Sequence, residues 1–221
     1  MPIRRPLTLP ILVAALALAG CTNERNLKIT EVGLTAVELH LDEPRGNSFN
    51  LVDQRLYYVN SAGYQSEIEL FGTIPGDGWL IVWEKPGYTG NPVAVDYVNY
   101  YGRNVPGIQV KEGFFSNTNA TSFAYRVTGR HTRYIFPFFF AYDDTEDVVK
   151  FGDSPRPTIG GSFTETNYLG ANKVRTQGTG ATPSKTISRL WNRAPTPAMI
   201  DTDSEADWER KDDNFGAATP N

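Results

Sequence analysis

Hydrophobic and polar residues alternate over short segments of the chain, and turn residues separate these segments. In residues 36–41, Val37, Leu39 and Leu41 fall on one face of an extended segment, which is the pattern of a strand with one buried face. Other short β-prone segments, bounded by Gly, Pro, Asn or Ser, are residues 56–59, 67–70, 93–97, 122–127 and 185–191. Many short strands at such spacing, without a sustained helical period, predict a β-sandwich or a β-barrel.

One segment departs from this alternation because it is apolar at every position. It follows the turn residues 74–78 and consists of residues 79–83, Trp-Leu-Ile-Val-Trp. A strand that is apolar on both faces is typical of the centre of a sheet. We therefore expect Trp79, Ile81 and Trp83 to share one buried face, with Leu80 and Val82 covered on the other. By contrast, the polar stretch 155–183 predicts a long loop with a short strand at most.

The N-terminus carries a different hydrophobic pattern. A short apolar run, residues 11–20, follows Arg4 and Arg5 and leads directly into Cys21. A basic start, a short apolar run and small residues at its end are typical of a secretory signal, and the run is shorter than the roughly 20 residues that span a membrane. Residues 18–21, Leu-Ala-Gly-Cys, resemble the lipobox of bacterial lipoproteins, which implies cleavage before Cys21 and acylation of its thiol and new amine. The alternative is an ordinary signal peptide with an incidental cysteine.

This interpretation divides the chain into a signal peptide (1–20), a tether (21–27) and a β-sandwich domain (28–221). The lipid, palmitate among its acyl chains, is expected to be the only membrane anchor, because no second apolar segment has membrane length. Thr22, rather than Asp, follows the cysteine, so we expect a place in the bacterial cell envelope at the outer membrane.

Charge and residue content limit the functions that we expect of this chain. The formal charge is −4, and becomes −6 once Arg4 and Arg5 leave with the signal, so the charge pattern of nucleic-acid binding is missing. Cys21 is the only cysteine. His40 alternates with apolar neighbours and is expected to face solvent, while His131 lies in a basic turn, so neither predicts a zinc site or a catalytic base. The sequence contains no Gly-x-Ser-x-Gly motif, no His-Glu-x-x-His motif and no phosphate-binding glycine loop. We expect a protein without cofactor or enzymatic activity.

The order of several segments resembles that of the lamin-tail domain, an immunoglobulin-like module also found on secreted and envelope proteins of bacteria. The segments that carry the resemblance are 29–32, 37–39, 49–53, 74–82, 186–189, 201–208 and 216–221. The resemblance implies an immunoglobulin-like β-sandwich that binds or tethers other macromolecules, and it supplies no catalytic residues.

The most apolar stretch of the mature chain is residues 134–142. Its residues Tyr134, Phe136 and Phe138 are candidates for an exposed aromatic surface that contacts a protein, a polysaccharide or a bilayer. The alternative is a buried strand, or a loop that covers one end of the sandwich. Pro137 argues against a central strand, because proline cannot donate a hydrogen bond to a neighbour.

A second aromatic group, Tyr97, Tyr100 and Tyr101, lies beside polar residues. It is a candidate for a sugar-binding surface of aromatic rings and polar side chains. The alternative is an ordinary strand surface followed by a turn.

Asp201, Asp203 and Glu205 place oxygen atoms at alternate positions, which makes the segment a weak calcium candidate. The alternative is a solvated acidic turn whose side chains accept backbone hydrogen bonds. In the family that it resembles, this segment precedes the closing residues of the sandwich. We therefore expect an ordered loop, with Ala206 and Trp208 facing inward and the three acids in water or bonded to nearby amides.

These patterns predict a lipid-anchored, non-enzymatic β-sandwich of the cell envelope that binds or scaffolds another macromolecule, with protein as the first choice of partner. Two alternatives stay open. One is a carbohydrate-binding surface module, and the other is a hydrolase with an acid pair or the accessory domain of one.

Overall fold

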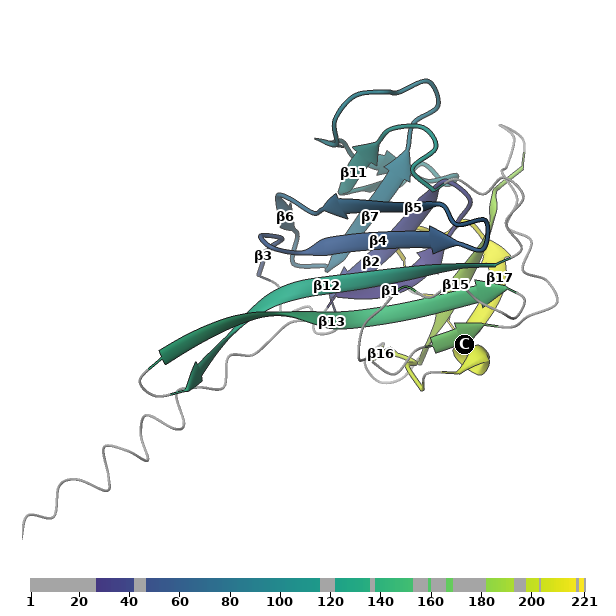
Figure 1. Ribbon diagram of the computed structural model, residues 1–221. Helices are drawn as coiled ribbons and strands as arrows, with labels where there is room; N and C mark the ends of the chain where they lie inside the picture. The colour runs from purple at the N-terminus through teal and green to yellow at the C-terminus, as the bar shows by residue number, and fades with distance from the viewer. Residues whose placement is uncertain are drawn as a thin grey trace, which may run out of the picture.

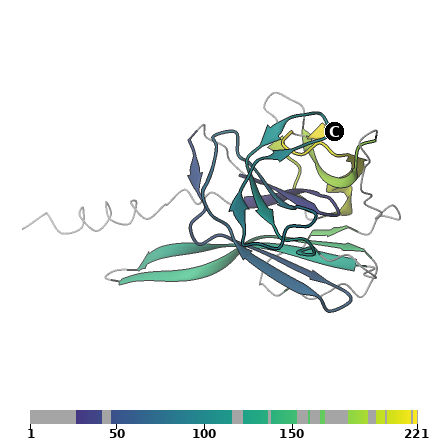
Figure 2. The same cartoon turned by 90° about the horizontal axis from the view of Figure 1, so that it is seen from above.

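A computed structural model describes residues 27–41, 47–115, 122–135, 138–152, 159, 166–168, 182–192, 198–202, 204–217 and 219–220. Within these residues the regular elements are β-strands, joined by one turn of 3-10 helix, η1 (Glu205–Asp207). Two sheets face each other as layers (Figures 1 and 2). The predicted all-β sandwich is therefore confirmed.

The larger sheet has nine strands in the order β16-β15-β1-β2-β7-β11-β8, and both β17 and β18 also pair with β15. Its strands are β1 (Leu27–Val32), β2 (Ala36–Leu41), β7 (Trp79–Glu84), β8 (Val93–Ala94), β11 (Gly107–Val110), β15 (Lys185–Asn192), β16 (Ala198–Met199), β17 (Trp208–Asp212) and β18 (Thr219–Pro220). β11 pairs with β7 in parallel, and so does β18 with β15, whereas the other pairs are antiparallel. In this sheet β1, the first strand of the domain, lies between β2 and the C-terminal strand β15.

The smaller sheet has five strands in the order β14-β13-β12-β4-β5. They are β4 (Arg55–Asn60), β5 (Gln65–Glu69), β12 (Ser122–Ile135), β13 (Phe138–Gly152) and β14 (Thr166–Tyr168). Two short ribbons pair β3 (Phe49–Asn50) with β6 (Thr73–Ile74) and β9 (Tyr97–Val98) with β10 (Asn104–Val105).

The main core lies between the two sheets, and a second apolar cluster covers the outer face of the larger sheet. The strand β7 contributes residues to both. Leu80 and Val82 belong to the core between the sheets, whereas Trp79 and Ile81 belong to a second cluster, on the outer face of the larger sheet. Trp83 packs against that cluster and is half-buried. The prediction of a strand covered on both faces is confirmed.

The outer face of the larger sheet corrects the prediction for His40. This residue is only 2% exposed, and its ring packs 4.1 Å from that of Trp79 and 5.0 Å from that of Trp191, between centroids. Burial lowers the pKa of His40 to about 4, so the ring is neutral near pH 7. The alternation predicts the strand β2 correctly, but both faces of this strand are covered.

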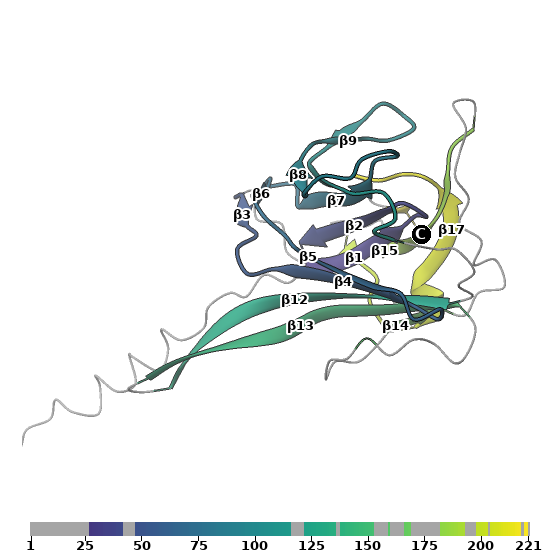
Figure 3. The ribbon, with the colours of Figure 1, turned by 45° about the horizontal axis from the view of Figure 1, so that its top comes forward.

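β12 and β13 form a hairpin that is much longer than the sandwich needs. β4 pairs with β12 only over residues 123–128, and β14 pairs with β13 only over 149–151. Beyond this, residues 129–135 and 138–144 pair only with each other among the described strands. We call these residues the arm, which projects past the other described strands in Figures 1 to 3. The apolar stretch 134–142 therefore spans two strands of a hairpin, on either side of residues 136–137.

The described part of the chain contains no helix with the length and apolarity that crossing a membrane requires.

Candidate binding site on the five-stranded sheet

The outward face of the five-stranded sheet carries a row of three side chains on three neighbouring strands. In the register of the sheet, Tyr57 of β4 stands opposite Glu67 of β5 on one side and Arg126 of β12 on the other. The strand β4 places Tyr57 outward, because its residues alternate between buried and at least partly exposed positions. The row therefore presents an acid, an aromatic ring and a cation side by side.

Contacts within the row hold its members in place. The guanidinium carbon of Arg126 lies 4.2 Å from the centre of the Tyr57 ring, in the range of a cation–π contact. Arg55 donates a hydrogen bond of 2.8 Å to Oε1 of Glu67. The Nε of Arg126 is buried and has no hydrogen-bond partner among the described residues. Arg126 as a whole is half-buried, and an unmatched buried donor such as its Nε is costly and favours an incoming acceptor.

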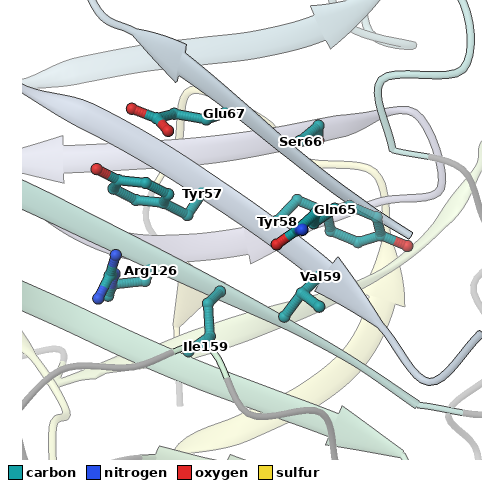
Figure 4. A pocket seen from close by; sticks show the side chains of 8 residues that line it. All are labelled: Tyr57, Tyr58, Val59, Gln65, Ser66, Glu67, Arg126 and Ile159. Carbon is teal, nitrogen blue, oxygen red and sulfur yellow. The ribbon is translucent and has the colours of Figure 1, made fainter. Parts of the chain in front are cut away.

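A hollow of about 340 Å³ lies over this row (Figure 4). Its lining residues are Tyr57, Tyr58, Val59, Gln65, Ser66, Glu67, Arg126 and Ile159. Figure 4 shows the side chains of Tyr57, Glu67 and Arg126 on adjacent strands, with Ile159 close to Arg126. The lining mixes amide, carboxylate, guanidinium and aromatic groups. Such a site suits a polar segment of a larger ligand, with hydrogen bonds at the cation and apolar contact at the ring.

Sequence reasoning missed Tyr57, Glu67 and Arg126 as a site. The alternation in residues 56–59 and 67–70 could place Tyr57 and Glu67 on the face of a strand. The third member comes from a strand that is about 60 residues further along the chain, and no local pattern predicts which residues of distant strands pair.

The three tyrosines of the predicted sugar-binding surface, at and beside the β9–β10 ribbon, do not share one surface in the structure. Tyr100 and Tyr101 are 44% and 63% exposed, and their rings meet edge to face at 5.3 Å. Tyr97 instead packs inward against Trp83 and Phe215, and its hydroxyl donates to Asp213 at 3.1 Å. Tyr97 is therefore a structural residue, whereas the surface role of the other two stays a prediction.

The candidates of the apolar stretch are only partly placed. Tyr134 lies in β12 and Phe138 in β13, near the end of the arm. Phe136 lies outside the described residues, and so does Cys21 at the predicted lipidation site.

The acidic segment is organised by cations of the protein. Asp201 forms ion pairs with Lys28, at 3.1 Å, and with the buried guanidinium of Arg189. Burial favours a higher pKa for Asp201, but the charges of Arg189 and Lys28 outweigh it and lower the pKa. The prediction for Asp201 therefore holds only in part, because the residue is exposed but its carboxylate pairs with two cations instead of backbone amides. Its carboxylate neutralises two cations that lie close to it.

The rest of that segment gives mixed outcomes. Trp208 is 5% exposed and faces the core as predicted, whereas Ala206 is exposed, because β17 begins only at Trp208. Glu205 is exposed in η1, and Asp203 lies outside the described residues. Among the residues that are described, no group of three or more His, Cys, Asp or Glu is placed to hold a metal ion.

Two buried carboxyl groups bind the C-terminal segment to the larger sheet. Glu31 and Glu38 are paired across β1 and β2, and each is 1% exposed. Oε1 of Glu31 accepts hydrogen bonds from Thr186, at 2.6 Å, and from the amide of Asn214, at 3.1 Å. Glu38 accepts one from the amide of Gly216. Carboxyl groups closed off in this way serve as structural acceptors for residues 214–216.

Burial raises the pKa of Glu31 to about 8, and burial together with the neighbouring Glu31 raises that of Glu38. A carboxyl group with a raised pKa binds a proton in the folded state at a pH where the unfolded chain has lost it. Its contribution to stability is complete below about pH 4.5 and is lost as the pH rises toward about 8. His40 acts in the opposite direction, because its contribution is lost as the pH falls from 6.5 toward about 4.

We expect Glu31→Gln to flatten the loss of stability between pH 6.5 and pH 8, where the contribution of His40 is complete and no longer changes with pH. The wild-type free energy of unfolding should fall by up to about 1.4 kcal/mol per pH unit for each such group. The neutral amide of the variant removes one of these groups. Urea unfolding at several pH values measures the slope, with the exposed Glu69→Gln as the matched control. An unchanged slope in Glu31→Gln would contradict the raised pKa.

Comparison of the chain with protein-family models, with curated proteins and with solved structures finds no match. The resemblance to the lamin-tail domain therefore stays a prediction from the sequence, while the all-β sandwich stands on the structure itself.

Proposed function

We propose that the protein is a lipid-anchored, non-enzymatic module of the bacterial cell envelope that binds another macromolecule, with a protein as the partner. The lipid on Cys21 would hold the domain at the outer membrane. The single observation that carries the binding role is the row Glu67–Tyr57–Arg126, with its hollow and the unmatched donor on Arg126.

Chemistry favours a protein partner at this row. The three side chains lie on the outward face of the sheet and place an acid, a ring and a cation on adjacent strands about 5 Å apart. Arginine and tyrosine are both enriched at protein interfaces, where they combine apolar contact with hydrogen bonding. A carbonyl or carboxylate group of the partner would meet the Nε of Arg126. One oxygen of each of the buried carboxyl groups Glu31 and Glu38 accepts a hydrogen bond from a backbone amide, which favours binding over hydrolysis as the role of the domain.

The test places a photo-crosslinking amino acid at Tyr57 in the acylated protein within the bacterial envelope. We expect one protein adduct of defined mass, which the second substitution Arg126→Met reduces at least tenfold. Methionine keeps an aliphatic chain against the ring but removes the donors. The same crosslinker at Val93, an exposed position on β8 of the other sheet, is the matched control. Equal adducts at Tyr57 and Val93, or an adduct that survives Arg126→Met, would overturn the proposal.

A carbohydrate-binding module is the second candidate, and the exposed pair Tyr100 and Tyr101 favours it. Exposed aromatic rings can stack on the apolar faces of sugars. In that case, electrophoretic retardation by envelope polysaccharide should fall when both tyrosines are replaced by alanine. It should stay unchanged in Arg126→Met.

A further inference from the structure

The charge of Arg126 in the row is not balanced by a described neighbour. Glu67 already accepts a hydrogen bond of 2.8 Å from Arg55. Arg126 contacts the ring of Tyr57, and its buried Nε has no acceptor. The exposed Glu69 stands one row further along, opposite Arg55. It lies about 12 Å from Arg126 across the sheet, which is beyond the screening length of about 8 Å at physiological ionic strength. Among the described residues, the guanidinium of Arg126 therefore has no counter-ion.

The side of Arg126 away from Tyr57 is apolar. Val148 of β13 stands opposite Arg126, and Ala124 precedes Arg126 by two residues on β12. Paired residues share a face of the sheet, and so do residues two apart, so both lie on the outward face with Arg126. Val148 is 1% exposed and Ala124 is 0% exposed, although neither belongs to the core between the sheets. Ile159 also lies close to Arg126 (Figure 4). Because these groups limit the access of water, an ion pair with Arg126 is stronger than one in bulk water.

The surroundings of Arg126 suit an anion with a single charge. The described cations nearest to it in the register are Arg55 and Lys150, each one strand away and two residues along. Arg55 is bound to Glu67, and Lys150 is engaged in interactions of its own. A phosphate group would bring a second negative charge without a second cation to receive it, and Glu67 beyond the Tyr57 ring would repel that charge. A carboxylate carries one charge, and its two oxygens match the N–H groups of a guanidinium.

The hollow has room for more than a carboxylate. Its volume of about 340 Å³ lies at the lower end of the range for small-ligand sites, about 300–1,000 Å³, which suits one or two residues of a peptide. Gln65 lines the hollow on β5, while Arg126 lines it on β12, with β4 between these strands. The amide of Gln65 is exposed and can both donate and accept hydrogen bonds. The hollow therefore offers a cation for an acidic group and a neutral amide for the backbone beside it.

We infer that the hollow receives a single carboxylate of the protein partner, either an Asp or Glu side chain or the C-terminus of a chain, which Arg126 binds through its Nε and one terminal N–H. This inference rests on the binding role proposed above and adds the chemistry of the contact. It also explains selectivity, because a neutral amide of the same shape would leave the guanidinium without a counter-ion.

The first test follows the Nε–H of Arg126 by NMR in the full chain, held in nonionic detergent, with the signal assigned by its loss in Arg126→Met. Three peptides serve as probes. Acetyl-Gly-Glu-Gly-amide carries a side-chain carboxylate, acetyl-Gly-Gln-Gly carries only a C-terminal one, and acetyl-Gly-Gln-Gly-amide carries neither. We expect at least one acidic peptide to shift the signal downfield and to bind at least tenfold more tightly than the neutral peptide. The acid with the larger shift identifies the source of the carboxylate.

Two controls separate this site from a general effect of charge. The Nε–H signal of the exposed Arg103 should stay in place with every peptide. Lys111→Met removes an exposed positive charge elsewhere and should change the affinity for the acidic peptide less than twofold, whereas Arg126→Met should lower it at least tenfold. Equal binding of acidic and neutral peptides, or an Arg126 signal that neither acid moves, would overturn the inference. Inorganic phosphate that binds more tightly than both acids would also overturn it.

The second test uses the photo-crosslinked adduct at Tyr57. Mass spectrometry locates the crosslinked residue of the partner, and we expect an Asp, a Glu or a chain end within a few residues of it. Replacing that acid by its amide, or extending the chain at that end, should reduce the adduct at least tenfold. An adduct that this change leaves intact would overturn the inference while the binding role stands. Without an adduct at Tyr57 the proposed protein partner fails, whereas the peptide titration still decides whether Arg126 selects a carboxylate.

Discussion

Replacing Arg189 by alanine is expected to lower the free energy of unfolding by about 3–5 kcal/mol, because it removes one partner of a buried ion pair. The guanidinium of Arg189 is 0% exposed and lies 3.1 Å from Oδ2 of Asp147, which is itself buried. Its Nε donates to the carbonyl of Ile29 at 3.1 Å, and its other amino group pairs with Asp201. Alanine would leave Asp147 charged and buried beside an empty space.

Two variants separate charge from packing in this result. Arg189→Met fills much of the space and keeps an apolar contact with Trp208, whose ring centre lies 4.7 Å from the guanidinium carbon. It should still destabilise the fold, because Asp147 loses the guanidinium with which it forms a buried ion pair. Arg55→Ala is the matched surface control, since Arg55 pairs with Glu67 while both side chains are nearly half exposed. Exposed pairs contribute at most about 1 kcal/mol. Equal losses in Arg189→Ala and Arg55→Ala, measured by urea unfolding, would contradict the buried pair.

The sequence predicted those parts of the fold in which one strand carries its own pattern. The run of residues 79–83 is apolar on both faces, and β7 is covered on both faces in the structure. This prediction succeeds because hydrophobic burial acts on a strand through its own pattern of apolar residues. The inward position of Trp208 instead follows from the resemblance to the lamin-tail domain, and this residue is buried.

Other features depend on what covers a strand, which its own residues do not encode. His40 alternates with apolar residues as a solvent-facing residue would, yet Trp79 and Trp191 cover it. Asp201 looks like a solvated turn residue until β1 and β15 bring Lys28 and Arg189 to it. Likewise, the candidate site depends on the register of three strands, and the arm depends on a turn inside one apolar stretch. Long-range pairing decides each of these features.

Deleting residues 201–221 is expected to remove most of the stability of the domain. The deletion takes away β17, which pairs with five residues of β15. It also takes Trp208 from the main core, Phe215 from the outer cluster and the partner of Lys28. Loss of a buried tryptophan costs about 3–5 kcal/mol, and loss of an ion-pair partner of Arg189 adds to this. The loss of Trp208 and the loss of the ion-pair partner Asp201 are coupled, because Arg189 contacts both residues. The sum of these two free energies is therefore an upper bound for their joint effect.

The summed loss from Trp208 and Asp201 is of the same order as the free energy of unfolding of a typical domain, which is about 5–15 kcal/mol. We therefore expect the truncated chain to lack a cooperative thermal transition, whereas Trp208→Ala alone should melt about 6–20 °C lower, at 2–4 °C for each kcal/mol. Deleting only residue 221, which lies outside the described residues, is the control and should leave the midpoint unchanged. Millimolar calcium should change little in the intact protein, because Lys28 and Arg189 already neutralise Asp201. A truncated chain with the wild-type melting midpoint would show that residues 201–221 do not stabilise the sandwich, and a large rise with calcium would make the acidic segment a metal site.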